Sequence, residues 1–444
     1  MEQSFSTSNL KRIWDLQTRK GDDRLLELFP DVKEAFLNRR DARRELRAAS
    51  RLPLIGDAET VLARRAETAS KSAEEARDAA LADTSDALIT AVEERKFSWG
   101  LRETAPVNGR RTFAIARTPG AFFAEQVLQR AVGDITAHRP TARQSIIANV
   151  TRVLDSNIPK LVIRTDFERF YENIDHRMLR RRLAQDFLSP TFRGLVEALL
   201  QETHAILGTD RGLPTGVGLS AKLAEYFLAD FDRQMSGIPR TLYYGRYVDD
   251  VVLILGEVKH GELDAGTELT RIGETARKNG LSLSSTKTTV ARTSPQWILA
   301  PFELLGYKLS SGPRATVSLT DGRQDELKRR IDCVFSSWSN CDQNNHGNRR
   351  LLIDRLRYLT GNFRLANNKR NAFIGIYFSN PHLRDADLLQ DLDRHLATAR
   401  NAAMLDPGLD VLVKTITFAD GFESRRLHRF TSHQLRRVRR AWDA

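Results

Sequence analysis

The stretch from residue 241 to residue 255, TLYYGRYVDDVVLIL, decides the predicted fold. An aromatic run at 241–244 and an apolar run at 251–255 flank a polar tip that contains Asp249 and Asp250. Two strand-like runs joined by a short polar segment are typical of a β-hairpin. A pair of aspartates at a turn is most often only a turn, so the interpretation of this pair depends on the residues around it.

A third strand is predicted at 161–166, LVIRTD, where an apolar run ends at Asp166. If this strand and the hairpin are neighbours in one sheet, the carboxylates of Asp166, Asp249 and Asp250 converge. Strand ends and hairpin tips are rigid platforms, and Mg²⁺ prefers carboxylate oxygens. Carboxylates from two chain segments therefore predict a site for two divalent ions, as in metal-assisted phosphoryl transfer.

The rest of the chain has a mainly helical pattern. A loop is expected at 103–111, which contains Pro106 and Asn108-Gly109, and a second at 212–218. Short strands are expected at 112–115, 281–290 and 302–309. Helices are expected over 1–100 (with 57–96 as one long helix or a helical hairpin), 120–135, 145–154, 176–207, the residues after 218, 262–280, and most of the chain from about 320. The alternation predicts an α+β fold with helices on one face of a sheet.

The charge balance admits two interpretations. The formal net charge is +12 and the pI is about 9.8, which fits either a basic solvated surface or a polyanionic partner such as nucleic acid. The segment 421–444 holds seven Arg against two acidic residues. It is interpreted as an RNA contact, with a solvated helix face as the alternative.

Several classes of protein are disfavoured by composition. The two cysteines, Cys333 and Cys341, lack CxxC spacing, and no His pairs with Cys or Glu at metal-ligand spacing. This suits a reducing cytoplasm and argues against a structural zinc. We expect a cytoplasmic protein without a membrane partner, because the first residues lack the apolar run of a signal peptide and no stretch approaches the length of a membrane span.

Five motifs between about residues 105 and 310 resemble, in order, those of reverse transcriptases. Tyr247-Val248-Asp249-Asp250 before an apolar strand is similar to the signature hairpin of that family. The stretch 166–174, DFERFYENI, resembles its first catalytic motif, and 212–216, GLPTG, with Ser220 downstream resembles its nucleotide-side loop and helix. Lys287 within 284–288, SSTKT, matches the lysine of the next motif, and 304–307, LLGY, looks like the primer-grip turn.

The resemblance implies an α+β right-hand polymerase with palm, fingers and thumb, acting as an RNA-directed DNA polymerase. Asp166 and Asp249 would bind two Mg²⁺ ions, with Mn²⁺ as a substitute, together with the backbone carbonyl of Phe167. Asp250 would support this metal site. Lys287 would protonate the pyrophosphate leaving group; the alternative is an exposed strand lysine.

The same resemblance implies how the nucleotide and the primer are bound. Tyr171 would be the steric gate that excludes a ribose 2′-hydroxyl; the alternative is a core aromatic. Further nucleotide contacts are expected from the loop Pro214-Thr215-Gly216 and from Arg110 and Arg111, with Arg117 as a competing candidate, because Arg suits bidentate phosphate contact. The primer strand would be positioned by Gly306 and Tyr307.

The chain also departs from the family. Many reverse transcriptases have Gln at the position of Thr215, and Thr does not reproduce its nucleotide contact, so nucleotide handling is expected to differ. No RNase H, endonuclease or maturase extension is recognisable. The expected organisation is a helical N-terminal extension over 1–100, fingers and palm over 101–310, and a helical thumb with a basic C-terminal region over 311–444.

Within the family, three stretches look most like bacterial antiviral-defence reverse transcriptases: the opening residues 3–21, the stretch 170–176 (FYENIDH) and the stretch 223–225 (LAE). The opening resembles a class whose operons encode two reverse transcriptases and a non-coding RNA. The expected partners are a non-coding RNA template, the DNA product, dNTPs, a second reverse transcriptase subunit and further copies of the chain. Three alternatives stay open: a retron-type enzyme, an untemplated or protein-primed DNA polymerase, and an inactive RNA-binding scaffold.

Overall fold

The computed structural model describes residues 3–20, 24–49, 58–107, 109–136, 141–312, 314–365 and 372–442. The chain forms two compact units, and neither is a continuous segment. The first comprises Met1–Arg139, Glu168–Phe231 and Lys278–Leu281, and the second comprises Pro140–Phe167, Asp232–Arg277 and Ser282–Ala444. The division into 1–100, 101–310 and 311–444 concerns domain roles and stays a prediction.

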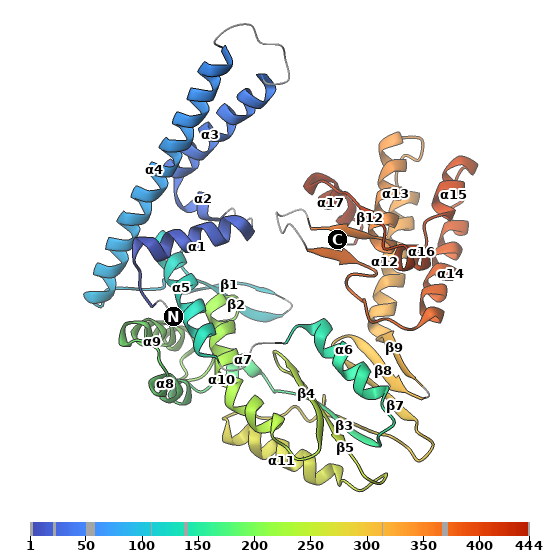
Figure 1. The fold of residues 1–444 in the computed structure, drawn as a ribbon. Coiled ribbons are helices and arrows are strands. Elements are labelled where there is room, and N and C mark those ends of the chain that lie inside the picture. Colours follow the sequence, from blue (N-terminus) through green and yellow to red (C-terminus); the bar gives the residue numbers. More distant parts are fainter. Residues whose placement is uncertain are drawn as a thin grey trace. The chain divides into compact units, whose positions relative to one another are not determined.

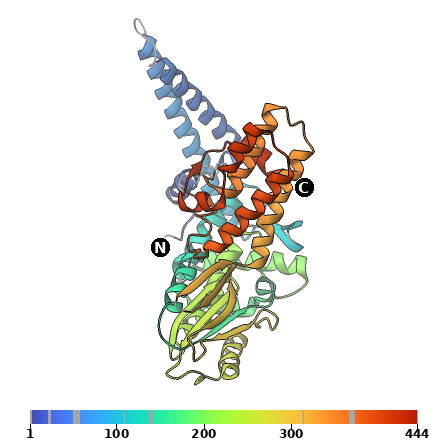
Figure 2. The ribbon, with the colours of Figure 1, turned by 90° about the vertical axis from the view of Figure 1, so that its right-hand side faces the viewer.

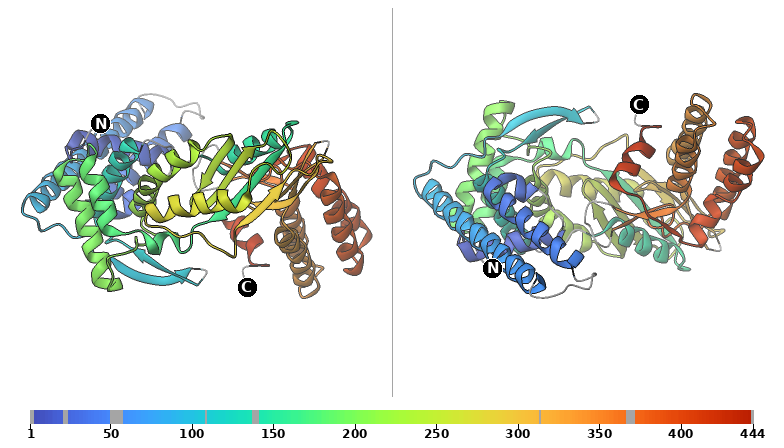
Figure 3. Two further views of the ribbon diagram at one scale, coloured as in Figure 1. Left: turned by 90° about the horizontal axis from the view of Figure 1, so that it is seen from below. Right: turned by 90° about the horizontal axis from the view of Figure 1, so that it is seen from above.

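The first unit begins with helices, as expected for 1–100: α1 (Thr7–Lys20), α2 (Arg24–Leu28), α3 (Pro30–Ala49) and α4 (Ala58–Glu93). The stretch left open between one helix and a hairpin is the single 36-residue helix α4. Helices α3 and α4 lie side by side (Figures 1 and 3). Buried apolar residues of α4 recur every seven or eight positions, at Ala66, Ala73, Leu81 and Leu88, which is the spacing of one packed face.

The loop expected at 103–111 is wrong. Strands β1 (Arg102–Val107) and β2 (Arg110–Ala114) pair antiparallel around a short turn; Asn108 lies outside the described residues. All six residues of β1 are exposed, so this strand lacks the alternation of apolar residues that marks a half-buried strand. The other helices of this unit are α5 (Pro119–Ile135), α7 (Phe170–Asn173), α8 (His176–Gln185), α9 (Pro190–Leu207) and most of α10 (Gly218–Ser236).

The second unit is built on a four-stranded antiparallel sheet with the order β4-β5-β3-β6 (Figure 2). The predicted hairpin is confirmed as β4 (Thr241–Tyr247) and β5 (Asp250–Gly256), and the predicted strand as β3 (Lys160–Asp166). The fourth strand, β6 (Thr289–Arg292), covers only the end of the piece expected at 281–290. Helix α6 (Arg143–Leu154) packs its apolar face on this sheet, and α11 (Ala265–Lys278) follows β5 in the chain.

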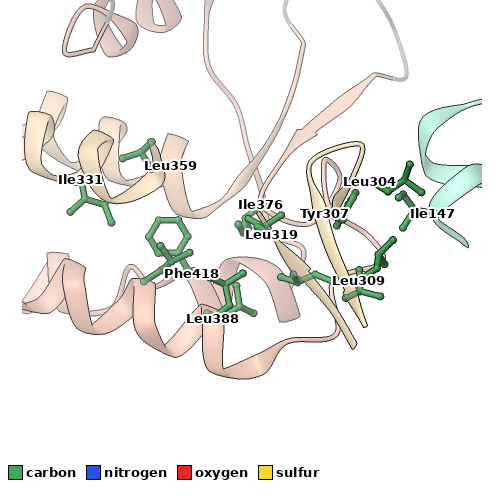
Figure 4. Close-up of a cluster of buried hydrophobic side chains, with 14 of the residues drawn as sticks. Ile147, Leu304, Tyr307, Leu309, Leu319, Ile331, Leu359, Ile376, Leu388 and Phe418 are labelled. Atoms are coloured by element: carbon green, nitrogen blue, oxygen red, sulfur yellow. The ribbon is translucent and has the colours of Figure 1, made fainter. Parts of the chain in front are cut away.

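A second sheet replaces the single strand expected at 302–309. Strands β7 (Leu299–Leu304), β8 (Tyr307–Ser311) and β9 (Ala315–Leu319) pair antiparallel in that order. The expected strand is interrupted because Leu305 and Gly306 both have positive φ, +50° and +75°, and form the turn between β7 and β8. Leu304, Tyr307, Leu309 and Leu319 of this sheet point into the main apolar core of the unit (Figure 4).

The chain beyond residue 320 is mostly helical, as predicted. It contains α12 (Asp321–Ser339), α13 (His346–Thr360), α14 (Ala386–Ala402), α15 (Pro407–Lys414), α16 (Phe418–Glu423) and α17 (Ser432–Arg439). The sequence analysis missed a small sheet of β10 (Asn362–Arg364), β11 (Phe373–Gly375) and β12 (Leu427–His428). Ile331, Leu359, Leu388 and Phe418 extend the apolar core into these helices (Figure 4). Over the described part of the chain, no helix is long and apolar enough to cross a membrane.

Candidate metal centre

The three predicted carboxylates converge in the second unit. Strands β3 and β5 are hydrogen-bonded neighbours, and their register places Asp166 directly opposite Asp250. Asp249 occupies the tip of the hairpin that precedes Asp250. One carboxylate oxygen from each of the three residues lies within 4.8 Å of the others. Since the ladder fixes the ends of both strands, this convergence is built into the sheet.

The hairpin tip is a two-residue turn made by Val248 and Asp249, because Tyr247 and Asp250 still pair. Val248 has a φ of +58°, a left-handed conformation that is costly for a β-branched residue. Such strain costs about 1–3 kcal/mol and persists only where surrounding contacts hold it. Two hydrogen bonds do so: the Arg246 guanidinium Nη1 donates to the Val248 carbonyl at 2.8 Å, and the Phe167 amide donates to the Asp249 carbonyl at 3.3 Å.

A buried ion pair fixes Arg246 beneath this tip. Its guanidinium donates two hydrogen bonds to the Asp232 carboxylate, Nε to Oδ1 and Nη2 to Oδ2, both at 2.8 Å. The two side chains are 2% and 0% exposed, so the pair is shielded from water and salt. The Tyr244 hydroxyl also donates to Asp232 Oδ1, at 2.5 Å. The C-terminal part of α10 is thereby tied to the turn that carries Asp249.

Two basic side chains offset part of the negative charge. Lys287 Nζ lies 3.0 Å from Asp166 Oδ2, and Arg164 Nη2 lies 2.5 Å from Asp250 Oδ1. Burial and the neighbouring Asp166 carboxylate raise the pKa of Asp249 above its ordinary value. A group of hard oxygen donors whose charges repel one another suits divalent cations such as Mg²⁺. The donor set therefore fits the predicted metal site.

Sequence reasoning named Lys287 as a candidate catalytic residue, and the structure brings it to Asp166; it missed Arg164, Arg246 and Asp232. Arg164 had a detectable signal: it lies two residues before Asp166 on the same strand, so both side chains point to one face. Arg246 was visible only as a charged residue inside an otherwise aromatic run. Asp232 had no local signal, because its role depends on where α10 packs.

The turn expected to position the primer has its own supports in the second unit. Tyr307 is fully buried, and its hydroxyl lies 3.2 Å from Gln144 Oε1 and 3.3 Å from the Ser379 carbonyl. The Arg143 guanidinium lies 4.8 Å from the centre of the Tyr307 ring and donates to the Leu305 carbonyl. The ring thus holds the turn from inside. A primer contact at Gly306 and Tyr307 stays a prediction. Because the Tyr307 side chain is buried, the backbone of the turn would have to make that contact.

The loop Pro214-Thr215-Gly216 belongs to the first unit and is anchored on β2. The Phe113 amide donates to the Thr215 carbonyl at 2.7 Å, and the Thr215 hydroxyl donates to the Arg111 carbonyl. Gly216 has a φ of +98°, and a Cβ there would lie 2.6 Å from the Phe113 carbonyl oxygen. Gly216 is therefore required by the backbone itself, and the Thr215 hydroxyl is already engaged.

The basic candidates of the first unit have different surroundings. Arg111 makes a bidentate ion pair with Glu103, with both distances 2.7 Å, while Arg110 is exposed. Arg117 and Gly216 line one cavity of about 590 Å³, so the structure places the competing candidate beside the loop. Tyr171 is half-buried, and its carbonyl accepts from the Leu213 amide at 2.9 Å. The nucleotide-binding roles of these residues and of Tyr171 stay predictions.

Comparison with known proteins relates part of the chain to one family. Residues 126–309 match the family model described as reverse transcriptase (RNA-dependent DNA polymerase), so this part of the chain is similar to a reverse transcriptase domain. No curated protein matches the chain. The domain assignment depends on the family match together with the convergence of the three carboxylates.

Two solved structures illustrate more distant similarity. One is an apo telomerase from Candida tropicalis truncated from its C-terminal domain, with 12% identity, a TM-score of 0.34, and coverage of 45% of each chain. The other is a telomerase from Candida albicans in complex with a TWJ fragment of telomeric RNA, with 10% identity and a TM-score of 0.35. That match covers 72% of this chain and 54% of the telomerase chain. The chain thus spans about half the length of each solved structure.

Proposed function

We propose that this chain, whose residues 126–309 match the reverse transcriptase domain model, is an RNA-directed DNA polymerase that adds dNTPs to a primer by a two-metal-ion mechanism. The observation that carries the proposal is the meeting of Asp166, Asp249 and Asp250 within 4.8 Å on neighbouring strands of that domain. Carboxylates from separate segments on a rigid sheet are what paired hard cations require.

The residues of the centre take distinct roles in this proposal. Asp166 and Asp249, with the carbonyl of Phe167, would hold the cations, and Asp250 keeps Arg164 at the edge of the site. Two bound Mg²⁺ ions would activate the primer 3′-hydroxyl and neutralise the leaving pyrophosphate. The 3′-hydroxyl loses its proton to water and its oxygen bonds to the α-phosphorus, while the bond from the α-phosphorus to the oxygen of the leaving pyrophosphate breaks. In this proposal the ammonium of Lys287, whose Nζ lies 3.0 Å from Asp166 Oδ2, donates a proton to the pyrophosphate.

The biological setting is a further part of the proposal. The resemblance of residues 3–21 and 170–176 to antiphage reverse transcriptases supports a role in antiviral defence, with a dedicated non-coding RNA as template. A second reverse transcriptase subunit and self-association belong to the same proposal. The two free cysteines are in keeping with action in the reducing cytoplasm.

The test is to purify the full chain with its bound nucleic acid, add dNTPs with Mg²⁺ or Mn²⁺, and sequence what is made. We expect DNA that is complementary to a co-purifying RNA and that requires the divalent ion. DNA with no complement in the sample would indicate untemplated synthesis, and DNA bonded covalently to the protein would indicate protein priming.

A matched pair of variants identifies the catalytic centre. Asp249→Asn removes one carboxylate from the cluster, and Asp325→Asn makes the same change at an exposed position of α12 in the same unit. Since bound metal contributes several kcal/mol to transition-state stabilisation, we expect Asp249→Asn to lower incorporation about 100-fold or more. Asp325→Asn should leave it unchanged. Equal activities for Asp249→Asn and the wild type, both folded, would overturn the proposal.

A further inference from the structure

One face of helix α3 carries a stripe of basic side chains far in sequence from the metal centre. At about 100° per residue its members fall within roughly 100° of one another around the helix axis, although two of them are adjacent in sequence; they are Lys33, Arg40, Arg43, Arg44 and Arg47. The four acidic residues of α3 fall on a different side of the helix at this periodicity; they are Asp31, Glu34, Asp41 and Glu45. The basic residues of the stripe and the acidic residues of α3 therefore lie on different faces of the helix.

This basic stripe of α3 is not used to stabilise the fold. All five side chains are exposed. Among the described residues, Arg43, Arg44 and Arg47 have no ion-pair partner, and Arg40 approaches Asp41 only to 3.9 Å. The residues that α3 buries, Val32 and Ala42, are not members of the stripe. Neutralising ion pairs would be expected if the stripe served only to keep the helix in place.

The stripe lies along a hollow rather than on a flat surface. The hollow has a volume of about 690 Å³ and is lined by the same basic residues together with Leu26, Phe36 and Leu37; none of its lining residues in the described part of the chain is acidic. Arg39 also lines the hollow, and its guanidinium lies 4.2 Å from the centre of the Phe36 ring. Burial, and to a smaller extent the neighbouring Arg43, lower the pKa of Arg39.

We propose that the basic stripe of α3 binds the phosphate backbone of RNA and is a second nucleic-acid-binding surface of this chain. Arginine forks match phosphate oxygens bidentately, and successive members one helical turn apart, about 5.4 Å, can contact successive phosphates of one strand. The aromatic and apolar residues of the hollow offer a place for a base or ribose. The choice of RNA over DNA rests on the proposed function, whereas the phosphate contact does not.

The test compares two variants with equal changes in net charge. Arg43→Gln/Arg44→Gln/Arg47→Gln removes three charges from the stripe, and Arg64→Gln/Arg65→Gln/Lys71→Gln removes three exposed charges from the neighbouring α4. Gln is a good helix former, so both variants should fold, which circular dichroism verifies. Affinity for labelled mixed-sequence single-stranded RNA is measured across a series of salt concentrations, with DNA of the same sequence as the second ligand.

We expect the stripe variant to lose about ten-fold or more in RNA affinity. The slope of log K against log salt should fall by about 2, since each phosphate contact with a single strand contributes roughly 0.7. The α4 variant should bind like the wild type. Equal losses in the two variants, or no loss in either, would overturn the proposal. So would a change in self-association of the stripe variant at unchanged RNA affinity, which would assign the stripe to a protein contact.

Two further measurements separate this proposal from the polymerase proposal. Asp249→Asn should bind the RNA as tightly as the wild type, because it leaves α3 untouched. The stripe variant should still extend oligo(dT) on poly(rA) when both are saturating. Loss of that extension at saturation would show that the stripe affects the metal centre, and would overturn its assignment as an independent RNA surface.

Discussion

At the scale of single residues, the chemistry of the site depends on the balance of charge around three carboxylates. Asp166 and Asp250 each have one basic partner, whereas the raised pKa of Asp249 reflects burial and its like-charged neighbours. The carboxylates could be predicted from sequence because each stands at the end of an apolar run. Arg164, which pairs with Asp250, shares a strand face with Asp166, but its partner follows only from the register of β3 against β5.

Replacing Arg164 tests this balance. Arg164→Met removes the ion pair with Asp250 and leaves three mutually repelling carboxylates. Without divalent metal we expect a loss of roughly 1–2 kcal/mol in the free energy of unfolding and a lower melting temperature. Saturating Mg²⁺ should then raise the melting temperature more than in the wild type, because the cation relieves a larger repulsion. Arg152→Met, at an exposed position of α6, is the control, and an unchanged Mg²⁺ response in Arg164→Met would contradict the prediction.

Gly216 permits a second prediction at the same scale. Gly216→Ala forces a side chain into a backbone with a φ of +98° and against the Phe113 carbonyl, at a cost of about 1–3 kcal/mol. If the loop contacts the incoming nucleotide, the KM for dNTPs should rise several-fold with a smaller change in kcat. Gly133→Ala is the matched control, because a Cβ there meets nothing within 4 Å and Ala is favoured in helices by about 0.5–1 kcal/mol. Equal kinetics for the two variants would exclude a nucleotide role for the loop.

At the scale of elements, the sequence predicted the helices and strands whose apolar residues are continuous or regularly spaced. It missed elements whose residues show no such pattern. Strands β3, β4 and β5 have continuous apolar or aromatic runs, and the helices have buried faces at regular spacing. Strand β1 was missed because all its residues are exposed. The turn between β7 and β8 was expected at 304–307 only from the family resemblance. The apolar pattern predicted an unbroken strand over 302–309, which is interrupted because Leu305, an apolar residue, adopts a positive φ there. In both cases tertiary pairing overrides the local pattern.

The connection of α10 to the hairpin supplies a prediction at this scale. Asp232→Asn breaks a fully buried ion pair, leaving Arg246 without its counter-charge, and we expect a cost of about 3–5 kcal/mol. Asp232→Leu combined with Arg246→Met removes both charges, so much of that stability should return. Activity should stay low in the double variant, because the Val248 carbonyl loses its donor and the strained tip is no longer held. Denaturant unfolding and incorporation rates measure the two effects separately.

Two outcomes have different meanings for this network. Recovery of both stability and activity in the double variant would mean that the pair serves only packing and that the hairpin tip holds itself. Recovery of stability alone would assign Arg246 as a positioning residue for Asp249. The Tyr244 hydroxyl, which also donates to Asp232, loses its acceptor in the double variant, so Tyr244→Phe in that background controls for an unsatisfied hydroxyl.

At the scale of the whole molecule, the two compact units are interleaved in sequence. The three carboxylates reach one sheet although more than eighty residues separate Asp166 from Asp249 in the chain, and most of that insertion forms part of the other unit. No local pattern encodes such a division, since it depends on contacts between distant segments. The family resemblance supplied the order of the motifs. Which segments pack together into each compact unit could be obtained only from the structure.

This division leads to a prediction about metal and local stability. Mg²⁺ bound by Asp166 and Asp249 favours only states in which β3 and β5 are paired, so it should slow amide hydrogen exchange over 160–167 and 247–256. At a hundred-fold excess over Kd the linkage is about 2.7 kcal/mol, which corresponds to roughly 100-fold slower exchange by opening of those strands. Helices α8 and α9, which belong to the first unit, should be unaffected. The same experiment on Asp249→Asn should show no effect of Mg²⁺ on amide exchange. Uniform slowing of exchange across both units, or slowing that persists in Asp249→Asn, would mean that the cation does not act at the three carboxylates.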